Sequence, residues 1–459
     1  MNDSKILVEE IAWKEPTDIA DAIYDTPGFV WLDTPNGEGY SYIGVLPFKT
    51  LTCKNGVLRV DGELRADDFF EYLKKEMENY RLSKESNIPF VGGAIGFLAY
   101  DYARSLESLP APSIDVLKTP DASVGIYDAC FVFDNKAKKA YIVSTGFSSQ
   151  GIDREVRAFE RLEVFKCLLD KEPCHRNMKY SSVTVRNELS QDQYVSQVDK
   201  VKSYIREGDI FEANFTGRFF AEWPLEDSIF TLYSRLRVKN GGAFSALYCG
   251  DGYEILSVSP EQFIEVSGSV VKTFPIKGTR PRGKTSEQDI QYKNDLLESE
   301  KDRAENIMIV DLMRNDFSKV CESSSVKVNK VCEVQTFPTV YHLVSEVEGI
   351  LAPGYHALDI LKACFPAGSI TGAPKIRAME IIAECESTAR GIYCGSMFYN
   401  SFDGDFNSSV MIRTITKKGE NLVFGAGGAV VIDSNSVEEY QEALTKASGI
   451  VTVLQEKSK

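Results

Sequence analysis

Phe365-Pro-Ala-Gly-Ser-Ile-Thr-Gly-Ala-Pro-Lys375 is the most distinctive stretch of this 459-residue chain. Its glycines and prolines predict a tight turn, and Pro374 predicts the start of a helix, because proline is tolerated in the first helical turn. Ser369 and Thr371 could cap this helix or hydrogen-bond a ligand, since a hydroxyl group can do either. The stretch therefore predicts a turn and a helix near 374–385 with two hydroxyl groups at their junction.

Segments on both sides of this turn alternate between helix and strand patterns. Ser190-Gln-Asp-Gln193 is a capping-box sequence, which predicts a helix that ends at Gly208. Further helices are expected near 286–314, 356–364 and 436–456, and strands near 210–220, 243–249, 254–258, 262–266, 270–276, 392–401, 407–416 and 421–424. The mixture predicts an α+β protein with sheets packed under helices.

The first part of the chain has a different pattern. Residues 1–148 alternate short apolar runs with turn signals, which is typical of strands. A helical pattern follows near 151–170, and the polar segment 171–189 is the best candidate linker. We therefore expect a strand-rich region over residues 1–180 and a second region over 190–455, packed together as one interleaved unit.

Composition limits the possible partners and ligands. The net charge of −15 repels phosphate backbones and anionic lipid, so neither nucleic acid nor a membrane is an expected partner. An anionic substrate would need local positive charge inside its site. The start of the chain shows no signal pattern, so a cytoplasmic protein is expected. The ten cysteines form no CxxC pair and are interpreted as buried free thiols, and three histidines exclude a His-rich metal site.

Two pairs of acidic residues have the spacing of neighbours on one helix face. Asp302 and Glu305 are three residues apart, and Glu439 and Glu442 repeat this spacing one turn before Lys446. Carboxylates on two helices could hold Mg²⁺, which prefers a few such oxygens together with waters. The alternative is that both pairs lie on solvated helix faces.

Four further features allow both a functional and a structural interpretation. His342 lies in an apolar run. It could be an acid, a base or an electrostatic group, or it could be a hydrogen-bonded core histidine. Arg413 interrupts an apolar strand, where it could bind a carboxylate or form a structural ion pair. Gly425-Ala-Gly-Gly428, which follows a short strand, would let backbone N–H groups approach an anion but lacks dinucleotide-binding spacing. Lys277, between a strand and a Gly-Thr turn, could be a desolvated nucleophile.

Taken together, these segments resemble one family. Lys301 to Glu305, Asp311-Leu-Met-Arg-Asn-Asp316, His342-Leu-Val-Ser345, Gly368 to Lys375 and Gly425 to Gly428 occur in the order found in the chorismate-utilising enzymes. These comprise the large subunits of anthranilate synthase, component I of aminodeoxychorismate synthase, isochorismate synthases and salicylate synthases. The resemblance implies two orthogonally packed, mostly antiparallel sheets flanked by helices, with the catalytic region over 190–455.

The resemblance also assigns roles to the acidic pairs and to the candidate anion-binding groups. Glu305 and Glu442 match the family's Mg²⁺ ligands, and Asp302 and Glu439 match carboxylates that support the metal and its waters. Mg²⁺ would bind the ring carboxylate of chorismate. The remaining matches imply groups that hold the enolpyruvyl carboxylate or line the pocket: Arg413, Tyr393, Gly427, Gly428, Lys446, Thr279 and Ser369. Metal, arginine and backbone dipoles would thus supply the positive charge that the acidic protein lacks.

Two positions divide the chemistry within the family. Isochorismate and salicylate synthases carry a water-activating lysine where this chain has Glu212, and aminating members usually carry glutamine there, so the role of Glu212 stays open. Anthranilate synthases typically contain Pro-Ile-Ala-Gly-Thr, whereas aminodeoxychorismate synthases contain Pro-Ile-Lys-Gly-Thr, as this chain does at 275–279. Lys277 therefore favours amination at C4 of chorismate.

The implied reaction forms 4-amino-4-deoxychorismate from chorismate and ammonia, on the path to p-aminobenzoate and folate. The Lys277 amine would add at C2 and expel the C4 hydroxyl group, and ammonia would then expel the lysine. Glu261 matches the acid that protonates the departing hydroxyl, and His342 would lie near C4 or the enolpyruvyl group. No nucleophilic cysteine elbow is present, so a separate glutamine amidotransferase subunit is expected to supply ammonia. The alternatives are an anthranilate synthase component I and a silent scaffold that only activates the amidotransferase.

Overall fold

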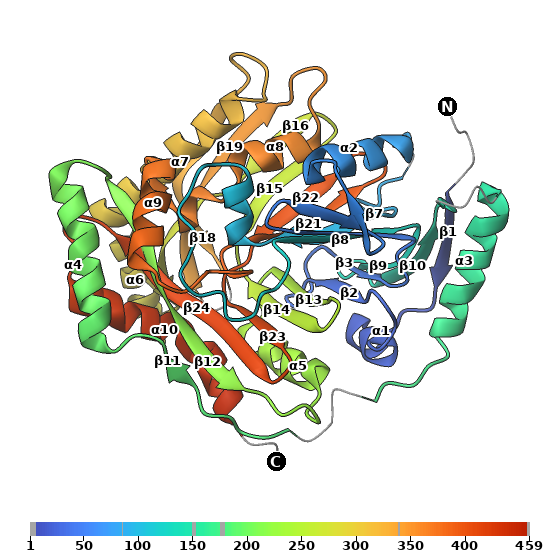
Figure 1. The fold of residues 1–459 in the computed structure, drawn as a ribbon, viewed down its shortest axis with the longest axis horizontal. Coiled ribbons are helices and arrows are strands. Elements are labelled where there is room, and N and C mark those ends of the chain that lie inside the picture. The colour runs from blue at the N-terminus through green and yellow to red at the C-terminus, as the bar shows by residue number, and fades with distance from the viewer. Residues whose placement is uncertain (1–5, 85, 149–152, 175–179, 338–339, 457–459) are drawn as a thin grey trace.

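The computed structural model describes residues 6–84, 86–148, 153–174, 180–337 and 340–456 (Figure 1). Two large sheets organise these residues, and neighbouring strands in them run antiparallel. The first sheet, sheet A, has the spatial order β1 (Leu7–Ile11), β10 (Lys139–Ser144), β9 (Ala129–Asp134), β3 (Tyr40–Gly44), β2 (Val30–Asp33), β13 (Phe244–Cys249), β14 (Tyr253–Ser259), β23 (Thr414–Lys418), β24 (Asn421–Val430), β12 (Glu212–Glu222) and β11 (Arg186–Asn187), with β20 (Gly372–Ala373) paired to β12.

The second sheet, sheet B, is built in the same way. Its spatial order is β17 (Ile276–Pro281), β19 (Val340–Ile350), β16 (Val270–Thr273), β15 (Gln262–Ser267), β22 (Phe406–Val410), β21 (Ser396–Ser401), β7 (Gly93–Leu98), β8 (Ala122–Tyr127), β4 (Lys49–Lys54), β5 (Val57–Val60) and β6 (Glu63–Arg65), with β18 (Lys327–Thr336) paired to β19. Each sheet joins strands from the first 150 residues to strands that follow residue 190, because β2 pairs with β13 and β7 pairs with β21. The α+β class predicted from the sequence is confirmed.

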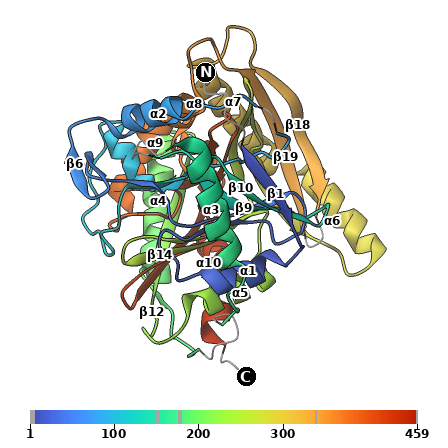
Figure 2. The same ribbon diagram turned by 90° about the vertical axis from the view of Figure 1, so that its right-hand side faces the viewer.

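Alternation along the strands separates two apolar layers. Val30 belongs to a cluster that contains side chains of both sheets, whereas its neighbour Trp31 belongs to a cluster on the other face of sheet A. This is the two-residue period of a strand with both faces buried. The outer face of sheet A is covered by α1 (Pro16–Ile23), α3 (Arg154–Leu168), α5 (Ile229–Asn240) and α10 (Ser436–Gln455). Figure 2 shows α3 lying across β1, β9 and β10.

The other helices complete the layers. The cluster that contains side chains of both sheets also takes up apolar faces of α2 (Phe69–Asn79), α7 (Glu300–Ser318) and α8 (Ala357–Cys364). A smaller cluster joins α4 (Gln191–Glu207), α9 (Lys375–Cys385) and β12. The predicted capping box of α4 is confirmed, and Gly208 ends this helix with a φ of 85°. Such a φ is the left-handed C-cap that glycine adopts most easily.

Several predicted boundaries are wrong for identifiable reasons. The helix expected over 286–314 is two helices, α6 (Ser286–Glu298) and α7, because Ser299 is extended and its hydroxyl accepts from the backbone N–H of Asp302. Pro374 caps α9 rather than starting it, and neither Ser369 nor Thr371 caps that helix. The strand expected over 407–416 is β22 and β23, which belong to different sheets.

The structure also tests the expected burial of the cysteines. The ten cysteines are free thiols as expected, but Cys167 and Cys174 are exposed, so the prediction of burial is wrong for these two.

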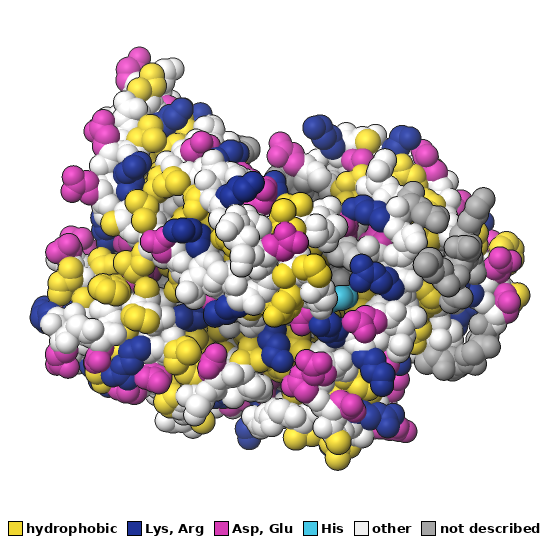
Figure 3. Space-filling model, turned by 90° about the horizontal axis from the view of Figure 1, so that it is seen from above, with side chains coloured by type: hydrophobic (Ala, Val, Ile, Leu, Met, Phe, Trp, Pro, Cys, Tyr) yellow, Lys and Arg dark blue, Asp and Glu magenta, His cyan; other side chains and the backbone are white. Residues whose placement is uncertain are grey.

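In the face shown in Figure 3, Lys and Arg side chains lie intermingled with Asp and Glu. Among the described residues, no helix combines the length and apolar character needed to cross a bilayer.

Candidate active site

A cavity of about 690 Å³ lies where β17, β19, β24, α7 and α10 converge. It gathers most of the candidate residues named from the sequence, although they are spread over almost 190 positions of the chain. Twelve of them line it: Glu261, Lys277, Thr279, Asp302, Glu305, His342, Ser369, Tyr393, Arg413, Gly427, Glu442 and Lys446. Gly428 and Glu439 are not part of the lining but lie behind it, since a side chain at Gly428 would come within 3.0 Å of Glu439 Oε2.

A bulge in β17 brings Lys277 to this cavity. The register between β17 and β19 shifts between Ile276 and Thr279, and Gly278 has a φ of 79°. A Cβ at Gly278 would meet Leu296 Cδ1 at 2.8 Å and Asp302 Cβ at 2.9 Å, so glycine is required twice over. Bulges redirect side chains, and this bulge explains why the Lys-Gly pair stands beside a binding cavity.

The Lys277 amine lies among carboxylates. Its Nζ donates a hydrogen bond to Glu212 Oε1 at 2.8 Å and lies 3.9 Å from Glu305 Oε2. Burial lowers the pKa of Lys277, but the negative charges of Glu212 and Glu305 outweigh burial and leave this pKa raised. The structure thus answers the question that the sequence left open at Glu212, which is buried and paired with Lys277.

Glu261 has the properties of a proton donor. Burial raises the pKa of its carboxyl group above the ordinary value, more than the hydrogen bond from Ser369 and the charge of Lys277 lower it. Ser369 Oγ donates to Glu261 Oε1 at 2.6 Å, and the backbone N–H of Glu261 donates to Ser259 Oγ at 3.1 Å. The predicted turn residue Ser369 therefore orients a candidate acid.

His342 is neutral in this site. Thr279 stands opposite it on β17, and Thr279 Oγ1 lies 2.9 Å from His342 Nδ1. Burial and the positive charge of Arg413 lower the pKa of His342 to about 4. The ring is therefore available as a hydrogen-bonding group or as a proton acceptor, but not as an imidazolium at neutral pH.

We expect His342 to make the free energy of unfolding depend on pH. The pKa of His342 is about 4 in the folded protein and about 6.5 when the chain unfolds. The contribution of His342 to the free energy of unfolding is therefore fully present above pH 6.5 and is lost as the pH falls towards 4. The loss should amount to roughly 3 kcal/mol. Urea unfolding at pH 7 and pH 4.5 measures it, with His342→Gln as the comparison. Equal losses in the two proteins would contradict the assignment.

Arg413 lies at a crossing between the sheets. It follows β22 of sheet B, precedes β23 of sheet A and has a φ of 50°, which is uncommon for a residue with a side chain. Within the described ranges, its guanidinium forms no ion pair or side-chain hydrogen bond, and it faces the cavity. An unpaired guanidinium in such a cavity is suited to bind a carboxylate in two-point fashion.

The glycine run lies inside β24 rather than after a short strand, so that part of the prediction is wrong. A Cβ at Gly427 would lie 2.0 Å from the Phe215 carbonyl oxygen, and one at Gly425 would lie 2.4 Å from the ring of Tyr393. Close packing against β12 and Tyr393 therefore requires these glycines. Lys446 Nζ donates to the carbonyl oxygen of Gly427 at 3.0 Å.

The four acidic candidates are surrounded by cationic side chains. Lys301 Nζ lies between two of them, 3.9 Å from Glu305 Oε1 and 3.8 Å from Glu439 Oε1. Lys446 pairs with Glu442 at 2.7 Å. Asp302, in contrast, pairs with Arg280 at 2.9 Å.

The carboxylates offer oxygen ligands of the kind that a magnesium ion shared with a substrate would need. Among the described residues, no three acidic, histidine or cysteine side chains are arranged as a complete metal cluster. Mg²⁺ commonly uses only one or two protein carboxylates, with waters and ligand oxygens filling its octahedron. Burial raises the pKa of Glu305 to about 7, more than the positive charges of Lys277 and Lys301 lower it. Glu305 and Glu442 therefore have the chemistry needed to hold this ion.

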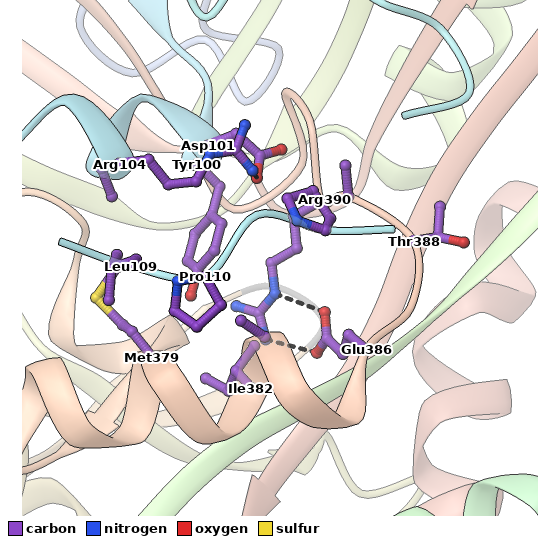
Figure 4. A pocket seen from close by; sticks show the side chains of 14 residues that line it. Tyr100, Asp101, Arg104, Leu109, Pro110, Met379, Ile382, Glu386, Thr388 and Arg390 are labelled. Carbon is purple, nitrogen blue, oxygen red and sulfur yellow. Dashed lines mark hydrogen bonds and ion pairs between the residues drawn. The ribbon is translucent and has the colours of Figure 1, made fainter. Parts of the chain in front are cut away.

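A buried charge network supports one wall of the cavity. Glu386 accepts hydrogen bonds from Arg390 and Arg218, and Arg390 Nη1 donates to the carbonyl oxygen of Ile370, next to Ser369. Figure 4 shows the pair of Glu386 and Arg390 at a second, much smaller cavity. The Arg390 guanidinium there lies 4.5 Å from the centre of the Tyr100 ring. The network ties the N-terminal part of the chain to the turn that carries Ser369.

Sequence reasoning missed several groups of the site. Lys301 lies one turn before Glu305, and this spacing alone could have suggested that the two residues pair. Asn214 and Arg280 also line the cavity. Their side chains carried no pattern that distinguishes them from ordinary polar residues, because their position depends on how β12 and β17 meet.

Comparison with known proteins identifies the family of this chain. The family described as chorismate binding enzyme matches residues 27–452. The chain belongs to this family of chorismate-utilising enzymes. It is 36% identical to aminodeoxychorismate synthase component 1 of Bacillus subtilis, covering 93% of this chain and 91% of that protein. It is 37% identical to the Escherichia coli protein of the same name, covering 85% and 83%.

Other relatives have a different activity in their names. Anthranilate synthase component 1 1 of Haloarcula marismortui is 34% identical, covering 94% of this chain and 88% of that protein. The crystal structure of anthranilate synthase component I from Streptococcus pneumoniae superposes with a TM-score of 0.81 at 34% identity, covering 90% and 92% of the two chains. The family and the fold are thus established, whereas the particular reaction needs a further argument.

Proposed function

We propose that this enzyme converts chorismate and ammonia to 4-amino-4-deoxychorismate, with Lys277 as a covalent nucleophile. The observation that carries this proposal is the buried amine of Lys277, which a bulge in β17 brings to a cavity with Glu261, Arg413 and Glu305. Anthranilate synthase, the nearest rival, has no need of a nucleophilic amine at this place. Relatives named aminodeoxychorismate synthase component 1 support the proposal at 36–38% identity.

The side chains can serve the reaction as follows. Glu305 and Glu442 would hold Mg²⁺, which neutralises the ring carboxylate of chorismate. Arg413 would bind the enolpyruvyl carboxylate, with Tyr393, Thr279, Lys446 and the backbone of Gly427 and Gly428 completing the pocket. Asp302 in the cavity lining and Glu439 behind it would support the metal and its waters.

Bond making and breaking then balance in two steps. Lys277 first loses a proton to water, because its raised pKa leaves the resting amine protonated. The neutral Lys277 amine then forms a bond to C2 while the C4–oxygen bond breaks, and Glu261 donates the proton that lets the hydroxyl group leave as water. Ammonia then forms a bond to C4 while the C2–nitrogen bond breaks, which releases Lys277. The surplus proton on the nitrogen that is newly bonded to C4 returns to Glu261. His342 is neutral and would orient the substrate near C4 or the enolpyruvyl group.

A glutamine amidotransferase subunit is the proposed source of ammonia. The names of the relatives designate a component 1, which implies a second component. The proposed product leads to p-aminobenzoate and folate, and the proposed location is the cytoplasm.

Product analysis tests the proposed reaction. The purified chain, chorismate, Mg²⁺ and an ammonium salt are incubated together, and the product is identified by its mass and fluorescence. We expect 4-amino-4-deoxychorismate, which retains the enolpyruvyl group. Anthranilate as the main product would identify the rival enzyme, and no turnover of chorismate would favour a scaffold that only activates its partner.

A further inference from the structure

Glu212 has an unusual environment for a carboxylate. It is completely buried and is not part of the cavity lining. Its Oε1 accepts the hydrogen bond from Lys277 Nζ, while its Oε2 has no hydrogen-bond partner among the described residues. A buried carboxylate oxygen without a partner costs stability. Such a group needs an explanation, and Lys277 is the only side chain that Glu212 contacts by a hydrogen bond in the described part of the chain.

The backbone holds Glu212 in a fixed place. It is the first residue of β12, paired in register with Ala373 of β20, and the preceding N–H of Phe211 donates to the Ala373 carbonyl oxygen at 2.8 Å. Two residues further, the N–H of Asn214 donates to the Thr371 carbonyl oxygen at 2.8 Å. These bonds tie Glu212 to the turn that precedes α9.

The backbone at Lys277, in contrast, lies within a β-bulge and is not held in a regular ladder. Its side chain has four rotatable bonds, and the bulge at Gly278 interrupts the ladder beside it. Glu305 lies 3.9 Å from Nζ, which is beyond hydrogen-bond distance. Of the two carboxylates that pair with the amine, only Glu212 therefore holds it directly.

We propose that Glu212 is a positioning residue that fixes the Lys277 amine for attack through the Nζ–Oε1 hydrogen bond. This inference rests on the proposed nucleophilic role of Lys277. Glu212 acts from behind the cavity wall and does not touch the substrate. A misplacement of about 1 Å can lower a reaction rate by about 100-fold. What matters in this proposal is the reach of the acceptor oxygen rather than the charge of the carboxylate.

Two substitutions separate reach from charge. Glu212→Gln keeps an oxygen at the same distance from the backbone and removes the negative charge. Glu212→Asp keeps the charge and withdraws the acceptor by one carbon–carbon bond, about 1.5 Å. Glu222→Asp, at the exposed far end of β12, is the matched control. Thermal unfolding of each variant verifies that it is folded at the assay temperature.

The measurement is the rate at which the chain gains a covalent chorismate-derived group at Lys277 when Mg²⁺ is present and ammonia is omitted, followed by mass spectrometry. We expect Glu212→Asp to lower this rate by about 100-fold and Glu212→Gln by less than about 5-fold, with the KM for chorismate changed by less than about 3-fold in both. The control should react at the wild-type rate.

Two results would overturn the proposal. Glu212→Asp reacting at the wild-type rate would show that the reach of the acceptor is immaterial, and Glu212→Gln being as slow as Glu212→Asp would show that charge decides. The failure of the proposed function is distinguishable from both, because in that case the wild-type chain itself would never acquire the group.

Discussion

Lys277→Ala is expected to abolish formation of 4-amino-4-deoxychorismate. Alanine cannot form the covalent adduct, so the rate should fall on the order of 10⁴-fold or more. Mg²⁺ binding should persist, since Glu305 and Glu442 are unchanged. Product formation by mass spectrometry and Mg²⁺ binding by calorimetry measure the two effects. Lys284→Ala, an exposed lysine just after the same strand, is the matched control and should retain activity.

Stability needs its own control in this experiment. Removing Lys277 leaves the buried carboxylate of Glu212 without its hydrogen-bond partner, which should cost about 3–5 kcal/mol. The double variant Lys277→Ala with Glu212→Gln removes that unpaired charge. We expect it to recover stability and to remain inactive. Recovery of activity together with stability, or substantial activity in Lys277→Ala alone, would contradict a nucleophilic role.

Glu305→Gln is expected to have the second large effect. A neutral amide is a much poorer ligand for Mg²⁺ than a carboxylate, so the affinity for the metal should fall steeply. The loss of several kcal/mol of electrostatic stabilisation corresponds to a rate about 10³-fold lower. Calorimetric titration with Mg²⁺ and the product assay measure these two quantities.

The control for Glu305 comes from the same helix. Asp311 lies on α7 with an exposed side chain that pairs only with Arg314 in the described structure. Asp311→Asn should bind Mg²⁺ and turn over chorismate as the wild type does. If Glu305→Gln bound Mg²⁺ with unchanged affinity, the assignment of Glu305 as a metal ligand would be wrong.

Local sequence rules predicted much of the fold. The capping box at Ser190 and the glycine at 208 located α4 correctly, because caps depend on a few adjacent residues. The same rules should have found the break at Ser299, where a serine followed by acidic residues marks a new helix start. The division of the 407–416 segment between two sheets leaves no comparable local signal, since it depends on which strands pair in space.

The site was predicted less evenly. Spacing alone placed Asp302 with Glu305 and Glu439 with Glu442, and the family resemblance brought them to one cavity with Lys277 and Arg413. The sequence did not show which lysine or arginine side chain pairs with which carboxylate. Arg280 takes Asp302, Lys301 lies between Glu305 and Glu439, and Glu212 binds Lys277 from behind. These pairings follow from the bulge in β17 and from the start of β12, which are features of the tertiary structure.

One measurement tests the central role of Lys277 most directly. The chain is mixed with chorismate and Mg²⁺ without ammonia, quenched and analysed by mass spectrometry of the intact protein and of its peptides. We predict a mass increase equal to chorismate less one water, located on Lys277 and lost when ammonia is added with release of 4-amino-4-deoxychorismate. Turnover of chorismate with ammonia in a protein that never gains this mass, or gains it at another residue, would contradict covalent catalysis by Lys277.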